Sequence, residues 1–164
     1  MKNCSKSKRE NMYENCVSFT GHRQAPYTLR GQLDRIIETL VTQGYTRFHS
    51  GMALGFDMMA AEAVLRAKQH HPEIRLIAVQ PFPEQDSKYS ENAKTRYRHI
   101  IEKADERITT SPYYSNAGVY HIRNKYLIDH CSLVVSYFNG TPGGTQKTLE
   151  YARRMGKTII TLNP

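Results

Sequence analysis

The chain alternates short β-prone apolar runs with segments of helical periodicity, and this alternation restricts the possible folds more than any other feature. The apolar runs cover residues 16–20, 46–50, 74–80, 106–110, 131–138 and 157–162. Between them, apolar side chains recur every three or four residues, as on the buried face of an amphipathic helix. Strands and helices that alternate through short connections form right-handed crossovers, which place helices on both faces of a parallel sheet. We therefore predict an α/β fold, Rossmann-like and doubly wound, with a mostly parallel sheet of about six strands.

The domain organisation follows from length and composition. With 164 residues, of which 39% are hydrophobic, the chain suits one buried core. Residues 1–14 are polar and charged without periodicity, which predicts a disordered leader before a single domain over residues 15–164. No apolar run reaches the roughly 18 residues of a membrane-spanning helix, and the N-terminus lacks the apolar segment of a signal peptide. We expect a cytoplasmic protein with no membrane partner.

Cysteine, histidine and charge content exclude several classes of site. Cys4, Cys16 and Cys131 are odd in number and widely spaced, which predicts free thiols rather than disulfides or a zinc site. The histidines show no metal-ligand spacing, so no metal is expected. The net charge is +8, but no basic stripe with interleaved aromatic residues and no helix-turn-helix pattern is present. An anionic small molecule therefore explains the charge as well as nucleic acid does, and nucleic acid is not expected as the main partner.

Ligands of doubly wound folds bind beyond the carboxyl ends of the strands, so the loops that follow the strands carry the candidate residues. After the first strand, Gly21 permits close approach of a ligand, and His22 and Arg23 follow it. Arg23 can form paired hydrogen bonds with a phosphate. The alternative to a ligand site is that Gly21 is an ordinary glycine at the end of a strand and that Arg23 is solvated.

The loop after the second strand leads directly into a helix. It contains Ser50, Gly51 and Gly55, and the exposed N–H groups of the following helix suit an anion. Asp57 either reaches a ribose hydroxyl or is present because an acid in the first turn of a helix is favoured by the helix dipole.

The two remaining loops differ in their chemistry. After the third strand, Phe82 lies between two prolines and either stacks on a base or packs in the core. After the fifth strand, residues 139–145 are rich in small and hydroxyl side chains. Gly143, Gly144 and Thr145 open the next helix and are predicted to hold a phosphate.

The fourth helix contributes a further candidate. Its apolar residues Val119, Ile122, Tyr126 and Leu127 are expected to face the sheet. Arg123 and Asn124 are then either surface residues or residues that point back over the edge of the sheet towards the ligand. The chain has neither a Walker lysine motif nor G-x-G-x-x-G, which argues against P-loop nucleotidases and hydride-transfer enzymes.

The ordered set of motifs T-G-H-R, S-G-M-A-L-G-F-D, R-N and G-G-T-Q-K-T-L-E-Y-A resembles the SLOG superfamily, and within it the bacterial YpsA-like branch. The similarity runs from about Cys16 to the C-terminus. The superfamily includes the lonely-guy phosphoribohydrolases, the Smf-type DNA-processing protein, and sensors of NAD-derived or ADP-ribose-like ligands. The resemblance therefore implies a Rossmann-like fold and a nucleotide-type ligand rather than one reaction.

The phosphoribohydrolases of the superfamily carry P-G-G-x-G-T-x-x-E and M-H-x-R-K. Pro142, Gly143, Gly144 and Glu150 match the first motif, whereas Gln146 and Lys147 replace its later glycine and threonine. His121 and Arg123 match the second motif, and Asn124 replaces its lysine. The resemblance makes Arg123 and Glu150 the candidate catalytic pair. Cleavage of an N-glycosidic bond develops positive charge on the ribose, which a carboxylate stabilises. A surface ion pair is the alternative for Glu150.

We expect a binder of a nucleotide or nucleotide-derived ligand, such as ADP-ribose, NAD or a nucleoside monophosphate, that acts as a sensor or signalling protein. No cofactor beyond such a ligand is implied. The expected ligand-binding residues are Gly21, His22, Arg23, Ser50, Gly51, Gly55, Asp57, Phe82, Arg123, Asn124, Gly143, Gly144 and Thr145. The alternatives are a phosphoribohydrolase-like enzyme that uses Arg123 and Glu150, and a single-stranded DNA-binding protein of the Smf type. An apolar helix face shared between the subunits of a homo-oligomer also remains open.

Overall fold

The computed structural model describes residues 12–164 and contains one sheet of six parallel strands. The strands are β1 (Cys16–Gly21), β2 (Arg47–Ser50), β3 (Arg75–Gln80), β4 (Glu106–Thr109), β5 (Leu133–Tyr137) and β6 (Thr158–Leu162). Every strand pairing is parallel, and the strand order across the sheet is β4-β3-β2-β1-β5-β6. The predicted fold class is confirmed, and each predicted strand is present with its bounds shifted by at most two residues.

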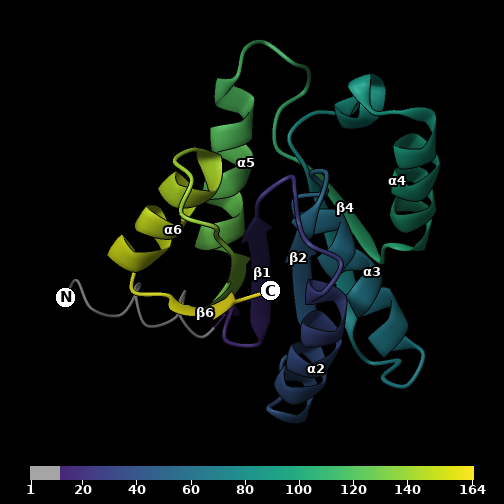
Figure 1. The fold of residues 1–164 in the computed structure, drawn as a ribbon, viewed down its shortest axis with the longest axis vertical. Helices are drawn as coiled ribbons and strands as arrows, with labels where there is room; N and C mark the ends of the chain where they lie inside the picture. The colour runs from purple at the N-terminus through teal and green to yellow at the C-terminus, as the bar shows by residue number, and fades with distance from the viewer. Residues whose placement is uncertain (1–11) are drawn as a thin grey trace.

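Helices cover both faces of this sheet. They are α2 (Leu29–Thr42), α3 (Phe56–Lys68), α4 (Glu91–Lys103), α5 (Gly118–Asp129) and α6 (Gly144–Arg154), with a short 3-10 helix, η1 (Gln85–Lys88), before α4. Helices α2, α3 and α4 pack on one face, and α5 and α6 pack on the other (Figure 1). None of the helices in residues 12–164 is long and apolar enough to cross a bilayer.

The strand order reverses at β1, which lies between β2 and β5. The crossover from β1 to β2 runs over one face of the sheet, and the later crossover into β6 runs over the other (Figure 1). The residues that end β1 and β5 lie side by side, since Gly21 pairs with Tyr137. Such a reversal opens a crevice at the carboxyl ends of the strands, where doubly wound proteins bind their ligands.

The larger part of the core lies between the sheet and α2, α3 and α4. Alternate strand residues, including Val17, Phe19 and Phe48, point to this face and are fully buried. They meet buried side chains of α2 and α3 such as Leu33 and Phe56. Each such side chain contributes about 1.5–3 kcal/mol when it leaves water, so this face supplies most of the hydrophobic stabilisation.

The prediction that Ile122 faces the sheet is wrong, because α5 is rotated relative to its apolar stripe. Ile122 is 53% exposed, whereas Arg123 is 5% exposed. The buried positions of α5 are Val119, Arg123, Leu127 and Ile128. Residues 119, 123 and 127 follow the helical period, and the arginine in the middle of this row has buried polar partners beneath it. Periodicity alone favours an apolar residue at that place.

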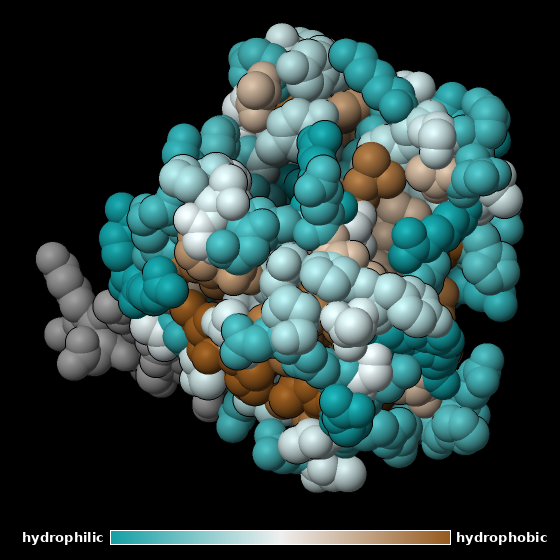
Figure 2. Space-filling view, in the orientation of Figure 1, coloured by the Kyte–Doolittle hydropathy of each residue, from teal (hydrophilic) through white to brown (hydrophobic). Residues whose placement is uncertain are grey.

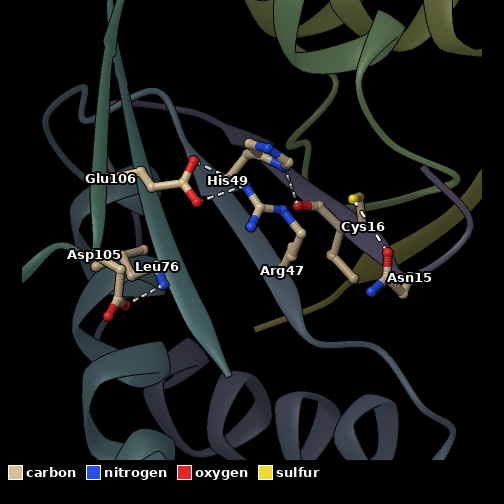
Figure 3. A network of polar contacts seen from close by, with 8 residues as sticks. Asn15, Cys16, Arg47, His49, Leu76, Asp105 and Glu106 are labelled. Atoms are coloured by element: carbon tan, nitrogen blue, oxygen red, sulfur yellow. Dashed lines mark hydrogen bonds and ion pairs between the residues drawn. The ribbon is translucent and has the colours of Figure 1, made fainter. Parts of the chain in front are cut away.

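Part of the face under α5 is polar, and its groups are paired with one another (Figure 3). Arg47 of β2 donates to both carboxylate oxygens of Glu106 of β4 at 2.9 Å. His49 is buried, its Nδ1 lies 3.2 Å from the carbonyl oxygen of Val17, and burial lowers its pKa to about 4. On the opposite face, Asp105 pairs with Lys68 of α3 and accepts a hydrogen bond from the Leu76 N–H at 2.9 Å. The Arg47 and Glu106 side chains are partly exposed, and the buried His49 has a backbone partner, so the face under α5 carries polar groups without leaving a buried one unpaired.

The outer surface is mostly hydrophilic in the view of Figure 2, with hydrophobic side chains gathered near the edge strand β6. Ile159 and Ile160 of β6 are partly exposed. Of the predicted leader, residues 1–11 lie outside the described residues, and Tyr13 packs edge-on against His130 with ring centroids 4.9 Å apart. Cys16 and Cys131 are buried free thiols, and Cys4 lies outside the described residues.

Candidate functional site

The loop that joins β2 to α3 has an unusual backbone that its own hydrogen bonds support. The Ser50 hydroxyl donates to the carbonyl oxygen of Asp57 at 2.8 Å and accepts from the Met52 N–H at 3.2 Å. Met52 is fully buried and has a φ of 58°, a left-handed conformation that non-glycine residues seldom adopt. Gly55 has a φ of 82°, and a Cβ there would collide with the carbonyl oxygen of Arg23. The loop therefore packs directly against the segment that follows β1.

The N-terminus of α3, predicted to hold an anion, is already supplied with partners from the protein. The Phe56 N–H donates to the carbonyl oxygen of His22 at 3.1 Å. Asp57 lies in the first turn, is 5% exposed, and accepts a hydrogen bond from the Ala53 N–H at 3.4 Å. Of the alternatives for Asp57, this geometry favours stabilisation of the loop and of the helix dipole over contact with a ribose.

Arg123 lies under the same loop instead of at the surface. Its Nη1 donates to the carbonyl oxygen of Gly51, and its Nε donates to the side-chain oxygen of Asn124 at 2.8 Å. A Cβ on Gly51 would lie 2.8 Å from Nη1 of Arg123 and 2.8 Å from Oδ2 of Asp57. The guanidinium and the carboxylate thus flank Gly51 closely, and only glycine leaves room for both.

Burial and charge act in opposite directions on Asp57. Burial raises the pKa of its carboxyl group to about 6, although the positive charge of Arg123 and the hydrogen bond from Ala53 both lower it. The protonated form is therefore favoured in the folded protein relative to the unfolded chain, in which an aspartate titrates near 3.9. Above about pH 6 the buried carboxylate is charged, and its lost hydration lowers the free energy of unfolding.

This shift predicts how stability depends on pH. Because the pKa of Asp57 is higher in the folded state, the folded protein binds more protons between about pH 4 and pH 6. Its free energy of unfolding should then fall by about 3 kcal/mol as the pH rises through that window, from this group alone. Asp57→Asn should remove that decrease, which urea unfolding at a series of pH values would measure. An unchanged pH dependence in Asp57→Asn would contradict this assignment.

The sequence analysis missed the residues that hold the loop from the side of β3. Gln85 of η1 donates from Nε2 to the carbonyl oxygen of Gly51 at 3.0 Å, and the Tyr89 hydroxyl donates to the carbonyl oxygen of Met52 at 3.2 Å. Tyr97 donates in turn to the side-chain oxygen of Gln85 at 3.2 Å. The available signal was the length of the connection over residues 81–90, since long ordered connections often carry functional contacts.

The loop between β5 and α6 differs from the loop between β2 and α3, because its backbone is open. Gly143 and Gly144 are exposed, and no side chain caps α6. No acidic residue lies in the first turn of this helix, and Thr145 is buried there. The first N–H groups of a helix have no partner within the helix, so they remain available to a ligand.

His22 lies beside this opening. Its ring stacks on Phe138, at the end of β5, with ring centroids 5.4 Å apart. Burial lowers the pKa of His22, and its Nε2 is the one buried side-chain nitrogen or oxygen without a hydrogen-bond partner in residues 12–164. A Cβ on Gly21 would lie 2.5 Å from the ring of Phe56, so the glycine is required by packing of the protein itself. Arg23 is exposed.

Phe82 packs inside an aromatic cluster and does not present a free face. It is 6% exposed, and Tyr114 and Tyr120 lie edge-on to it with ring centroids 5.3 and 5.9 Å away. Of the alternatives for Phe82, packing is the one that the structure favours. Tyr114, in the loop before α5, is 52% exposed and is the ring of this cluster that a ligand can reach.

The structure does not bring the candidate catalytic pair together. Arg123 is buried under Gly51, whereas Glu150 is exposed on α6. No hydrogen bond or ion pair joins them or involves Glu150 in the part of the chain that the structure describes. Catalysis by this pair stays a prediction.

Comparisons with known proteins identify the relatives of this chain. The family model of the YspA SLOG family matches residues 11–160. The chain is 33% identical to the SPbeta prophage-derived protein YoqJ of Bacillus subtilis, over 83% of this chain and 88% of that protein. It is 34% identical to UPF0398 protein BH1768 of Halalkalibacterium halodurans, over 81% of this chain and 71% of that protein.

Solved structures of DNA processing protein A share the fold. The Helicobacter pylori protein, whose structure was described for its single-stranded DNA binding mode, matches 96% of this chain and 69% of its own with a TM-score of 0.69 and 19% identity. The Streptococcus pneumoniae protein matches with a TM-score of 0.65 and 17% identity. This second match covers 96% of this chain and 52% of the pneumococcal protein, so the chain spans about half of that protein's length. From the match over residues 11–160, the chain belongs to the YspA SLOG family.

Proposed function

We propose that the protein binds a phosphate-bearing, nucleotide-type ligand at the carboxyl ends of β1 and β5, with a phosphate at the N-terminus of α6. The observation that carries this proposal is the contrast between two helix N-termini at the same edge of the sheet. At the N-terminus of α3, the Phe56 N–H is bonded to the His22 carbonyl, and the acidic residue Asp57 lies in the first turn. The N-terminus of α6 lacks both a side-chain cap and an acid, and its glycines are exposed.

The groups around the α6 N-terminus suit such a ligand. Unpaired N–H groups and the positive end of the helix dipole together favour a phosphate. Arg23 is exposed after β1, the strand next to β5, and its fork of N–H groups can add a charged contact. Beside the crevice, Nε2 of His22 is buried without a hydrogen-bond partner. Tyr114 supplies a partly exposed ring at the same edge, suited to a base.

Gly144→Asp tests the phosphate position without damaging the fold. A Cβ on Gly144 meets nothing within 4 Å, and an acid in the first turn of a helix is favoured by the dipole. The thermal midpoint should therefore stay the same or rise slightly. A carboxylate beside a bound phosphate should weaken binding by about fivefold or more, from roughly 1 kcal/mol of repulsion. Calorimetric titration with AMP, NAD and ADP-ribose would measure the effect.

Gly144→Asn is the matched control, because it adds a side chain of the same size without the charge. It should change the affinity for these nucleotides much less than Gly144→Asp. Equal affinity in Gly144→Asp and the unchanged protein would place the phosphate elsewhere. Absence of binding to every nucleotide tested would count against the proposal itself. Chromatography of the same mixtures would detect free base, and its loss in Glu150→Ala would instead support the phosphoribohydrolase-like alternative.

Single-stranded DNA is the second candidate ligand. The likeness of the fold to DNA processing protein A favours it, and so do two exposed rings at the carboxyl edge, Tyr113 at 65% and Tyr114 at 52% exposure. These observations weaken the expectation that nucleic acid is not a main partner. Binding to oligothymidylate should then fall steeply with salt, with a slope near −0.7 per neutralised phosphate. Tight binding of a mononucleotide that competes with oligothymidylate would indicate one shared site, whereas affinity for the mononucleotide alone would exclude this candidate.

A further inference from the structure

A large cavity lies away from the proposed ligand site, on the outer surface of the helices that cover one face of the sheet. It has a volume of about 910 Å³ and is lined by the loop after β1 and by α2, α3 and α4. Helix α3 packs against both α2 and α4 and lies between them (Figure 1). The cavity is therefore a groove with α3 as its floor and α2 and α4 as its walls. Lining positions run from Met59 to Gln69, about 15 Å at the rise of an α-helix.

Part of the floor of this groove is apolar. Met59 and Leu65 of α3, together with Ala25 of the preceding loop, line it and are partly exposed. These side chains also contact the main core, so they are held in place by packing beneath them. Apolar side chains of a partner protein can cover such a row of partly exposed apolar side chains.

The lining of the groove as a whole carries excess positive charge. The lining includes five lysine or arginine residues and one histidine, against the single carboxylate of Glu62. Three of these cations are neutralised, by the ion pairs Arg66–Asp34, Lys68–Asp105 and Arg96–Glu62. Within residues 12–164, no ion pair involves Arg30 on the α2 wall or Lys103 on the α4 wall. Two cations on opposite walls are thus free to meet negative charges on one occupant.

The position of Arg30 is set by its neighbour. Its Nη1 donates to the Tyr27 hydroxyl at 2.6 Å, and its guanidinium carbon lies 5.8 Å from the centre of the Tyr27 ring. The hydroxyl and the ring orient the guanidinium without neutralising it. Tyr27 is 73% exposed at the same place, which adds an aromatic surface at that end of the groove.

We propose that this groove binds an acidic, amphipathic segment of a partner protein. Its apolar side chains would cover Met59 and Leu65, and its carboxylates would pair with Arg30 and Lys103. A second copy of this chain is a poor occupant, since a net charge of +8 repels another basic molecule. Nucleic acid is disfavoured as well, because its closely spaced phosphates would lie beside Asp34, Glu62 and Asp105, whereas a peptide can place a few carboxylates at Arg30 and Lys103 alone. The groove and its occupant are independent of the ligand proposed for the carboxyl edge.

Selection from a random peptide library on phage, with the intact protein as bait, tests this proposal. The enriched peptides should combine apolar residues at helical spacing with several Asp or Glu residues. A synthetic peptide of the enriched sequence should bind Arg30→Glu/Lys103→Glu about tenfold or more weakly than the unchanged protein. The matched control is Arg35→Glu/Arg153→Glu, which reverses the same number of exposed cations outside the groove and should bind nearly normally.

Several outcomes would overturn the proposal. Enriched peptides without acidic residues, or no enriched peptides, would remove the basis for an acidic partner. Equal weakening in both double variants would show a general effect of net charge. Loss of oligothymidylate binding only in the groove variant would identify a nucleic-acid surface, and loss of concentration-dependent self-association in that variant would identify a contact between copies. Circular dichroism of both double variants would confirm that they remain folded.

Discussion

Gly55→Ala is expected to lower the free energy of unfolding by about 4 kcal/mol or more, enough to unfold many single domains. Part of the loss is backbone strain, since the φ of 82° at Gly55 costs a residue with a Cβ about 1–3 kcal/mol. The rest is a collision of the new Cβ with the carbonyl oxygen of Arg23. That oxygen cannot move away easily, because the preceding carbonyl of His22 accepts the Phe56 N–H. Urea unfolding followed by circular dichroism would measure the effect.

Gly31→Ala is the control for this substitution and should change stability in the opposite direction. Gly31 lies within α2, and a Cβ there meets only the end of the flexible Arg35 side chain, at 3.4 Å. Alanine in a helix is favoured over glycine by up to about 1 kcal/mol. If Gly55→Ala were as stable as Gly31→Ala, the contact between the loops after β1 and β2 would not exist in solution.

Arg123→Met is expected to cost about 3–5 kcal/mol at neutral pH, because it removes one partner from a buried pair of charges. Asp57 would keep its negative charge under the loop without the opposing guanidinium, and its pKa would rise further. The Gly51 carbonyl would lose one donor and retain Gln85. As the pH falls below about 6, Asp57 becomes protonated in the unchanged protein too, so the difference between the two proteins should shrink.

Two further variants separate support of the loop by Arg123 from direct contact between Arg123 and a ligand. Arg123→Lys retains the charge but cannot reach both the Gly51 carbonyl and the Asn124 side chain with one ammonium group, so an intermediate loss is expected. Arg153→Met removes an exposed arginine from α6 and should change stability by less than about 0.5 kcal/mol. If Arg123→Met unfolded like the unchanged protein and failed only in ligand binding, Arg123 would be a ligand contact and not a support of the loop.

The fold could be predicted because its signals are local. Each strand is a short apolar run, and each helix shows its own period, so the alternation was readable without long-range information. Glycine after a helix is a further local signal: Gly44 and Gly156 follow the C-caps of α2 and α6 and have positive φ values of 97° and 71°. The placement of the candidate loops at one edge followed from the parallel sheet, since its strands all end on the same side.

The sequence by itself therefore determined the α/β class, the approximate strands and helices, and the set of loops that meet at the carboxyl edge. The tertiary structure alone decided the strand order, the burial of Arg123 in place of Ile122, and which of two glycine-rich helix starts is open. These features depend on contacts between residues far apart in the chain, such as Arg123 with Gly51 and His22 with Phe56. The periodicity of a helix predicts its buried face only when that face is apolar. It cannot predict a buried polar residue whose hydrogen-bond partner comes from another element.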